Sequence, residues 1–299
     1  MNGYLHDDYA RSLQEFGEPR FLPRCQGWVL VRRIPNSEEL DAMGCYPLFC
    51  CREWSELAAD LSALDLVSVS MVPDPFGDYT FKYLQQSFPD VAYPFKEHFV
   101  VAPNKEHAAG ISKHHRYYSR RALQELRVEV CETPIEFLDE WMMLYSELIA
   151  RHQLRGIKQF SRNAFKIQLE IPGLVMFRAL RDDEIAGAHL WYRNSHLATS
   201  HLAAFSETGY RLGASYALYW KAIEYFRKHG CWLNIGAGAG TFGKADDGLA
   251  KFKKGWATET RTTYFCGRIL DREKYSRLLD RSHPETDVYF PAYRSGELS

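Results

Sequence analysis

The stretch that decides the fold is residues 173–205, GLVMFRALRDDEIAGAHLWYRNSHLATSHLAAF. It contains three mainly apolar runs, at 173–181, 185–192 and 196–205, and the turn Asp182-Asp183-Glu184 separates the first two. Short apolar runs bounded by turn residues are typical of β-strands, and strands joined by short turns pair antiparallel. We therefore expect a three-stranded antiparallel meander in this stretch.

The residues that follow predict a helix between two strands. A loop at 207–213 opens a helix at 214–229, and Gly230 stands where a glycine commonly ends a helix. One apolar stripe with charged residues opposite is expected of a helix that covers a sheet. A strand at 231–235, a helix at 249–256 and a closing strand at 260–269 complete the pattern.

The sequence before the meander also alternates strands and helices. Strands are expected at 26–34, 66–72 and 96–102, and helices at 54–64, 112–126 and 134–152. Thr133 before Pro134 fits a helix cap followed by proline at the first helical position. This order predicts an α/β (α+β) fold, with the charge-rich stretch at 104–128 as the border between two halves.

Length and composition place the chain among ordinary globular proteins. Its 299 residues correspond to about two domains. Hydrophobic residues make up 46% and charged residues 25%, a balance that excludes wholesale disorder. With 37 basic and 38 acidic residues the net charge is −1, which argues against nucleic-acid binding through overall positive charge but leaves room for a local basic patch.

The first residues and the cysteines favour a cytoplasmic location. The start of the chain lacks the basic and apolar regions of a signal peptide, and no apolar run reaches the ~18 residues of a membrane span. The seven cysteines include no Cys-x-x-Cys, and the adjacent pair Cys50-Cys51 cannot form an unstrained disulfide. We therefore expect reduced thiols and no membrane span.

The run at 238–245 nearly matches the phosphate-binding loop G-x-x-x-x-G-K-[ST]. Ala245 stands where a hydroxyl would hold Mg²⁺, and Asp246 and Asp247 would repel a triphosphate, so triphosphate hydrolysis is disfavoured. The histidines lack zinc-ligand spacing, and no G-x-S-x-G motif is present. We therefore expect neither a metal site nor a Ser-His-Asp triad.

Two further features suit an anionic ligand. Small residues at 210–215 would let a ligand approach the N–H groups at the start of the helix. The helix at 113–121 places Lys113, Arg116 and Arg120 on one face among aromatic residues. That face suits a phosphate or an RNA backbone, and the alternative is a solvated helix face.

Four motifs suggest a family. They are TSHLAA at 199–204, LNIGAG at 233–238, DGLAKFKKGW at 247–256 and FPAYR at 290–294. Together with the element order, they resemble the GNAT superfamily of acyltransferases, and more closely its FemAB-like and BioF2-like branch. The resemblance covers roughly residues 110–296. It implies a GNAT-like fold with two GNAT-like halves packed as in Fem-type transferases, an N-terminal half at 1–110 and an acyltransferase half at 111–299.

The resemblance also implies an activity. We expect an N-acyltransferase that moves an acetyl or aminoacyl group from a CoA thioester or an aminoacyl-tRNA to an amine. The expected cofactor is acyl-CoA without a metal. The implied acceptor is a small-molecule amine or an amine like that of a peptidoglycan precursor, and tRNA is the alternative partner. A different class of function stays open, a non-catalytic binding module that associates with RNA through the helix at 113–121.

The implied site lies in a cleft between the strand of His201 and the strand at 231–235. The residues expected to bind the donor are Tyr210, Arg211, Gly213, Ala214, Ser215, Gly236 and Gly238. Tyr210 and Ser215 depart from the usual Gln/Arg-x-x-Gly-x-Gly/Ala pattern, which puts coenzyme A in doubt.

Five residues are candidates for catalysis and acceptor binding. His201 is expected as base or relay, and Lys253 is expected to hold an anion. Arg116, Arg120 and Asp247 are expected to bind the acceptor. The alternatives are a core histidine for His201, a solvated face for Lys253 and a helix cap for Asp247.

Overall fold

The computed structural model describes residues 3–103, 110–239, 248–282, 289–295 and 297. The chain divides into two compact units. Unit 1 comprises Met1–Gly3, Lys96–Arg155 and Gln159–Thr262, and unit 2 comprises Tyr4–Phe95, Gly156–Lys158 and Thr263–Ser299. The division differs from a single border between residues 110 and 111, because the last part of the chain groups with the N-terminal residues. The assignment of two GNAT-like halves stays a prediction.

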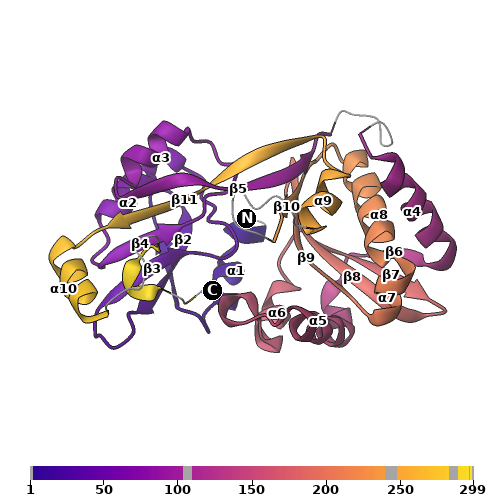
Figure 1. The fold of residues 1–299 in the computed structure, drawn as a ribbon, viewed down its shortest axis with the longest axis horizontal. Helices are drawn as coiled ribbons and strands as arrows, with labels where there is room; N and C mark the ends of the chain where they lie inside the picture. Colours follow the sequence, from indigo (N-terminus) through magenta and orange to yellow (C-terminus); the bar gives the residue numbers. More distant parts are fainter. Residues whose placement is uncertain (1–2, 104–109, 240–247, 283–288, 296, 298–299) are drawn as a thin grey trace. The chain divides into compact units, whose positions relative to one another are not determined.

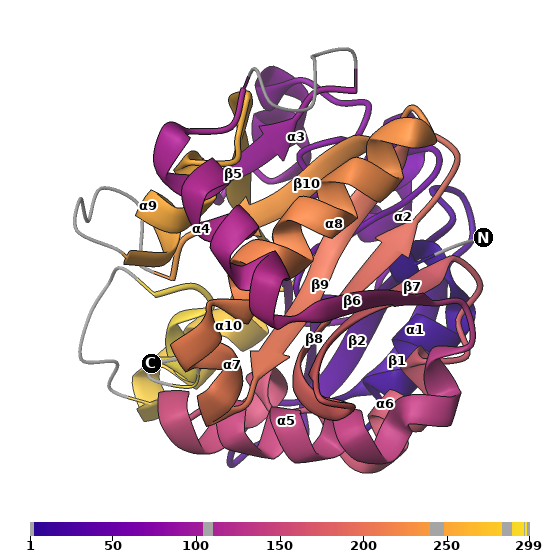
Figure 2. The same ribbon diagram turned by 90° about the vertical axis from the view of Figure 1, so that its right-hand side faces the viewer.

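Unit 1 is built on a mixed sheet (Figure 2). Its hydrogen-bonded order is β5 (Val91–Val101), β10 (Trp232–Ala237), β9 (Leu197–Phe205), β8 (Glu184–Arg193), β7 (Leu174–Arg181) and β6 (Arg127–Cys131). Strands β6 to β9 pair antiparallel, which confirms the meander expected at 173–205. Strand β10 runs parallel to β9 and antiparallel to β5.

Helices cover both faces of this sheet (Figures 1 and 2). Helices α4 (Lys113–Glu125) and α8 (Ala214–Lys228) lie on one face, and α5 (Leu138–His152) and α6 (Arg162–Gln168) lie on the other. The apolar stripe of α8 packs on the strands, where Phe226 contacts the rings of Phe177 and Trp191. Burying one such side chain contributes about 1.5–3 kcal/mol. The core of unit 1 is therefore the layer between α8 and the sheet.

The segment at 207–213 was expected as a loop and forms a short helix, α7 (Glu207–Leu212). Its first turn is capped because the Ser206 hydroxyl accepts a hydrogen bond from the N–H of Gly209. Gly209 also lies so close to β8 that a Cβ would stand 1.8 Å from the carbonyl oxygen of Ala186. The expectation was wrong because this cap and this close packing outweigh the low helix propensity of glycine.

Unit 2 contains the other strands of the same hydrogen-bonded sheet and has its own core. These strands are β1 (Glu18–Leu22), β2 (Gly27–Arg33), β3 (Leu40–Gly44), β4 (Ser68–Met71) and β11 (Glu259–Ile269), whose residues from Thr263 belong to this unit. Only the β3–β4 pair among these is parallel. The helices are α1 (Asp7–Ser12), α2 (Leu57–Ser62), α3 (Phe81–Ser87) and α10 (Arg272–Ser282). The apolar core includes Trp54, Phe49 and Leu57.

The FPAYR motif at 290–294 has a structural role in unit 2. Arg294 donates to both carboxylate oxygens of Asp41, which is fully buried on β3. The hydroxyl of Tyr293 is hydrogen bonded to Ser68 and Asp41. A buried charge without its partner is strongly destabilising, by about 3–5 kcal/mol. This ion pair therefore holds the C-terminal segment on the sheet of unit 2.

No helix in the described part of the chain is both long enough and apolar enough to span a bilayer. The seven cysteines are free thiols in the structure, and all but Cys50 are buried.

Candidate functional site

In unit 1, the parallel strands β9 and β10 are hydrogen bonded to each other over only part of their length. They are paired over three positions, from Trp232 opposite Leu197 to Asn234 opposite Thr199. Strand β9 then runs on to Phe205 and β10 to Ala237 without further mutual pairing. Unpaired strand ends expose backbone polar groups that need other partners. Polar side chains that include Lys253 and His98 lie beside the end of β10.

Gly236 and Lys253, two of the predicted site residues, meet at the end of β10. Gly236 has φ +77°, a conformation that suits glycine, and its register with β5 is irregular. The ammonium group of Lys253, from helix α9 (Gly248–Lys254), donates to the carbonyl oxygen of Ala237 at 2.7 Å. A Cβ on Gly236 would lie 3.0 Å from Lys253 Nζ. The glycine therefore makes room for the lysine, and Gly238 follows directly after β10.

Helix α9 is held in place by a buried histidine of α4. His115 Nδ1 is hydrogen bonded to the Ser112 hydroxyl, and Nε2 lies 2.8 Å from the carbonyl oxygen of Phe252. A Cβ on Gly255 would stand 2.1 Å from His115 Cε1. Burial lowers the pKa of His115, so its ring is a neutral packing element. This contact sets the position from which Lys253 reaches β10.

His98 and Asn234 form a hydrogen-bonded pair beside Lys253. His98 lies on β5 opposite Ala237, and its Nδ1 is 2.9 Å from Asn234 Oδ1. Burial, with the charges of Lys253 and Lys96, lowers the pKa of His98 to about 4. His98 was not predicted from the sequence. Its place in the site depends on the pairing of β5 with β10, and the pairing of strands far apart in the chain cannot be seen in a sequence.

His201, expected as base or relay, lies on β9. Its Nε2 is 3.1 Å from Gln168 Oε1 on α6, and its ring contacts Phe160 and Tyr192. Burial lowers the pKa of His201 to about 3, so the imidazole stays neutral in neutral solution. Its catalytic role stays a prediction.

A second buried histidine lies on the α8 side of the sheet. His189 Nε2 is 2.8 Å from the hydroxyl of Ser200, which is also hydrogen bonded to the hydroxyl of Tyr219. Burial, with the charge of Lys253, holds the pKa of His189 well below its usual range. No partner of His189 Nδ1 is found among the described residues. A sequence cannot signal this cluster, because its members come from two strands and a helix.

The loop expected to bind the donor is the junction of α7 and α8. Gly213 adopts φ +70° between the two helices, and no side chain caps the first turn of α8. Ala214 is buried and Ser215 is half-buried, while Arg211 is exposed. The exposed ring of Tyr210 lies 4.0 Å from the guanidinium of Arg151. Uncapped N–H groups and the helix dipole suit an anion, and the binding of the donor at this junction stays a prediction.

Two of the three residues expected to bind the acceptor, Arg116 and Arg120, lie one turn apart on α4. Arg120 is exposed on α4 and Arg116 is half-buried there, next to the buried row of His115, Ser119 and Ala122. The spacing of Lys113, Arg116 and Arg120 on α4 puts them on one side of the helix, and their role in binding stays a prediction. Asp247, like the rest of 240–247, lies outside the described residues. The structure brings together Gly236 and Lys253, with His98 and Asn234 in addition.

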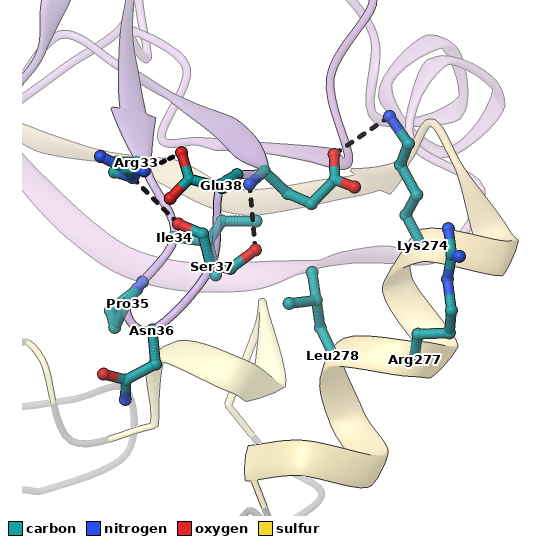
Figure 3. A pocket seen from close by; sticks show the side chains of 10 residues that line it. Arg33, Ile34, Pro35, Asn36, Ser37, Glu38, Lys274, Arg277 and Leu278 are labelled. Atoms are coloured by element: carbon teal, nitrogen blue, oxygen red, sulfur yellow. Dashed lines mark hydrogen bonds and ion pairs between the residues drawn. The ribbon is translucent and has the colours of Figure 1, made fainter.

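Unit 2 contains a separate hollow of about 680 Å³ (Figure 3). It is lined by the turn between β2 and β3 and by α10. Its charged side chains pair with one another, since Lys274 lies 3.0 Å from Glu39 and Arg33 is paired with Glu38. This hollow offers few unsatisfied groups to a ligand, and the candidate site is therefore placed in unit 1.

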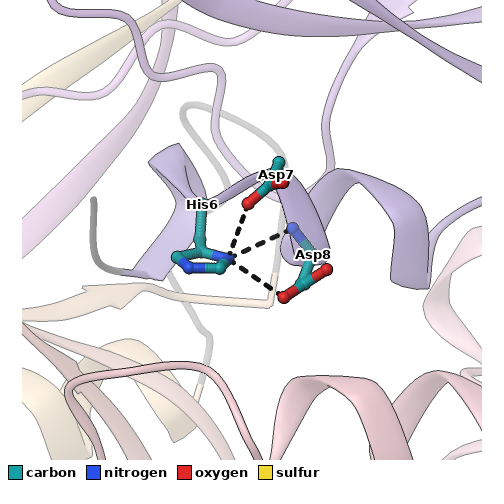
Figure 4. A group of neighbouring side chains, drawn as sticks. All are labelled: His6, Asp7 and Asp8. Carbon is teal, nitrogen blue, oxygen red and sulfur yellow. Dashed lines mark hydrogen bonds and ion pairs between the residues drawn. The ribbon is translucent and has the colours of Figure 1, made fainter.

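His6, Asp7 and Asp8 are close enough together to hold a metal ion (Figure 4). Nδ1 of His6, however, accepts a hydrogen bond from the N–H of Asp8 and so caps α1. Arg11 forms ion pairs with both carboxylates, at 3.2 and 3.0 Å. These contacts account for the cluster as the capped first turn of a helix.

The meander, the helix after it and the parallel strand that separates from β9 can now be compared with known proteins. Residues 109–247, a little under half of the chain, match the family model of the acetyltransferase (GNAT) domain. No curated protein matches the sequence.

Three solved structures share the fold over nearly the whole chain. FemX has a TM-score of 0.67 and 14% identity, and the match covers 91% of this chain and 93% of FemX. L-PGS from Bacillus licheniformis has a TM-score of 0.59 and 15% identity, covering 94% and 98%. The C-terminal DUF2156 domain of a protein described as a lysylphosphatidylglycerol synthetase from Agrobacterium fabrum has a TM-score of 0.62 and 15% identity, covering 93% and 92%. At such identities these likenesses establish the fold, and they confirm the expected GNAT-like architecture.

Proposed function

We propose that this chain is an N-acyltransferase that moves an acyl group from acyl-CoA to the amine of a small molecule or of a peptidoglycan-precursor-like acceptor. The observation that supports the proposal is the uncapped N-terminus of α8 in a region that matches the GNAT domain model. Close by in the same unit, Lys253 packs against Gly236 at the end of β10, where β9 and β10 are no longer paired. Acyl-CoA is proposed because a phosphorylated donor fits the N–H groups after Gly213. Aminoacyl-tRNA is the other donor class, and the test below separates the two.

The donor binds in this proposal with a phosphate at the first turn of α8, next to Ser215. Backbone N–H groups there are charge-assisted donors to a phosphate oxygen. Tyr210 and Arg211 from α7 lie at the same junction, and the exposed guanidinium of Arg211 suits a second phosphate contact. Arg116 and Arg120 on α4 are proposed to hold an anionic part of the acceptor, and Asp247 its ammonium group.

Chemistry then requires an amine to attack the acyl carbonyl carbon. The developing oxyanion needs preorganised donors, and Lys253 supplies a fixed ammonium group at the end of β10. His201 is proposed as a relay that keeps a neutral imidazole on β9. No observation favours an RNA-binding module without catalysis over this function.

Donor binding tests the proposal. A carboxylate at position 215 would repel a phosphate at the start of α8, so Ser215→Asp should weaken acetyl-CoA binding at least tenfold by titration calorimetry. Ser146→Asp, which adds the same charge at an exposed position on α5, is the matched control and should bind normally. Binding of aminoacyl-tRNA but not of acetyl-CoA would move the proposal to the second donor class. Binding of neither would contradict it.

A further inference from the structure

The pair His98–Asn234 has one defined hydrogen-bonding arrangement. The backbone N–H of Gly236 lies 3.0 Å from Asn234 Oδ1. A backbone N–H can only donate, so the side-chain atom that faces it must be the carbonyl oxygen of Asn234 and not its amide nitrogen. The orientation of the Asn234 amide is therefore fixed by the main chain of β10.

This orientation determines the tautomer of His98. The same oxygen, Asn234 Oδ1, lies 2.9 Å from His98 Nδ1 and can only accept. His98 must therefore carry its proton on Nδ1, which leaves a lone pair on Nε2 when the ring is neutral. No hydrogen bond of His98 Nε2 to another described residue is found, and the side chain is half-buried.

The surroundings keep this imidazole neutral. Lys253 from α9 and Lys96 from β5 disfavour the imidazolium, while Glu97 from β5 and the hydrogen bond to Asn234 favour it. Burial is the largest effect, and together they lower the pKa of His98 to about 4. A base this weak cannot take a proton from a free ammonium ion efficiently. It can take one from a nitrogen that has already attacked a carbonyl carbon, because that nitrogen is far more acidic.

We propose that His98 carries a proton from the amine nitrogen to the leaving group of the donor, and that Asn234 is the positioning residue that holds His98 in the required tautomer. This inference rests on the proposed acyl transfer and deepens it by assigning the proton transfers. His98 then takes the role of base that sequence analysis gave to His201.

The neutral amine attacks the acyl carbon, so that a C–N bond forms and the carbonyl oxygen becomes an oxyanion. The nitrogen, now positively charged, gives its proton to His98 Nε2. The oxyanion collapses, the C–S bond to the donor breaks, and the departing thiolate takes the proton from the imidazolium. The products are an amide and a thiol, and His98 returns to its neutral form. With an ester donor the broken bond is C–O and the product is an alcohol.

Nuclear magnetic resonance can determine the tautomer of His98 without any substrate. In the full chain labelled with ¹⁵N-histidine, two-bond ¹H–¹⁵N spectra should show His98 with its proton on Nδ1, and His98→Asn identifies its signals by their loss. Asn234→Ala should shift His98 toward a mixture of tautomers while the protein stays folded. A proton on Nε2 in the wild-type protein would overturn the proposal.

A second experiment measures the steady-state kinetics of amide formation in histidine variants. His98→Asn keeps an N–H donor for Asn234 Oδ1 but removes the Nε2 lone pair, so kcat should fall at least 100-fold while the KM for the donor changes less than threefold. His229→Asn, at an exposed histidine that contacts the carbonyl oxygen of Tyr225, is the matched control and should retain full activity. Unchanged kcat in a folded His98→Asn protein would overturn the shuttle and leave acyl transfer standing. A wild-type protein that forms no amide with either donor class would overturn both.

Discussion

At the scale of single residues, Gly236 shows how backbone conformation serves the site. Its φ of +77° and its closeness to Lys253 Nζ both depend on the absence of a side chain. The sequence marked Gly236 as part of a glycine cluster, but it could not show that the lysine passes over this particular glycine. The placement depends on helix α9, which is docked through His115.

Gly236→Ala tests two roles of this glycine: it adopts a positive φ, and it leaves space for the side chain of Lys253. The positive φ should lower the free energy of unfolding by about 1–2 kcal/mol, and the new methyl group should displace Lys253 from Ala237. Amide formation should fall about tenfold or more, as measured by initial rates. Gly230→Ala is the matched control, because Gly230 has φ +67° and no atom within 4 Å of the added Cβ. Equal loss of activity in both variants would show that strain alone is responsible.

Residues on the strands were predicted better than the pairs they form. The sequence placed His201 on its strand correctly, yet it did not show that Gln168 and Phe160 enclose its ring. His98 and Asn234 are 136 positions apart in the chain, and only the antiparallel pairing of β5 with β10 brings them together. Side-chain pairs of this kind depend on register, which local sequence patterns do not specify.

At the scale of elements, the docking of α9 on α4 controls the position of Lys253. The ring of His115 is fixed at both nitrogens, so it cannot turn away from a larger residue at position 255. The meander and helices α2, α4, α5, α8 and α9 follow from hydrophobic periodicity and caps, and these were predicted from the sequence. The helices α1, α3, α6, α7 and α10 were not predicted. Helix α7 depends on its cap and on the close packing of Gly209 on Ala186, which a periodic pattern does not show.

Gly255→Ala is expected to move α9 away from α4. The added Cβ would meet the fixed ring of His115, and overpacking of this kind costs about 1–3 kcal/mol. The amides of α9 should then exchange faster with deuterium than in the wild-type protein. Gly248→Ala, at the other end of α9 and with open space around its Cβ, should leave this exchange unchanged. Adding His115→Ala should relieve part of the Gly255→Ala cost, and purely additive effects would contradict the contact.

At the level of the whole molecule, the three histidines with the most strongly lowered pKa values, His98, His189 and His201, link stability to pH. The pKa values of His98 and His201 lie near 4 and 3 in the folded chain, and that of His189 lies well below its usual value. Below pH ~6.5 the unfolded chain binds protons at these histidines while the folded chain does not. Stability is therefore present above that pH and is lost as pH falls toward 4.

This linkage predicts a steep loss of stability in mild acid. His98 and His201 should each lower the free energy of unfolding by up to about 1.4 kcal/mol per pH unit between pH ~6 and ~4.5, and His189 should act in the same direction. Urea unfolding at several pH values measures the slope, and His201→Asn should make it shallower. A free energy of unfolding that stays constant from pH 7 to 5 would contradict the burial of these rings as neutral groups.

Formation of an amide product is the property that distinguishes an N-acyltransferase from a binding module on the same fold. The full chain would be incubated with isotope-labelled acetyl-CoA or aminoacyl-tRNA and a panel of amines. The products would then be identified by their masses in mass spectrometry. We expect a labelled amide with one donor class, and at least a tenfold lower yield with Lys253→Ala because the fixed ammonium group at β10 is lost. Absence of labelled amide with every donor and acceptor, from a folded protein, would contradict the account.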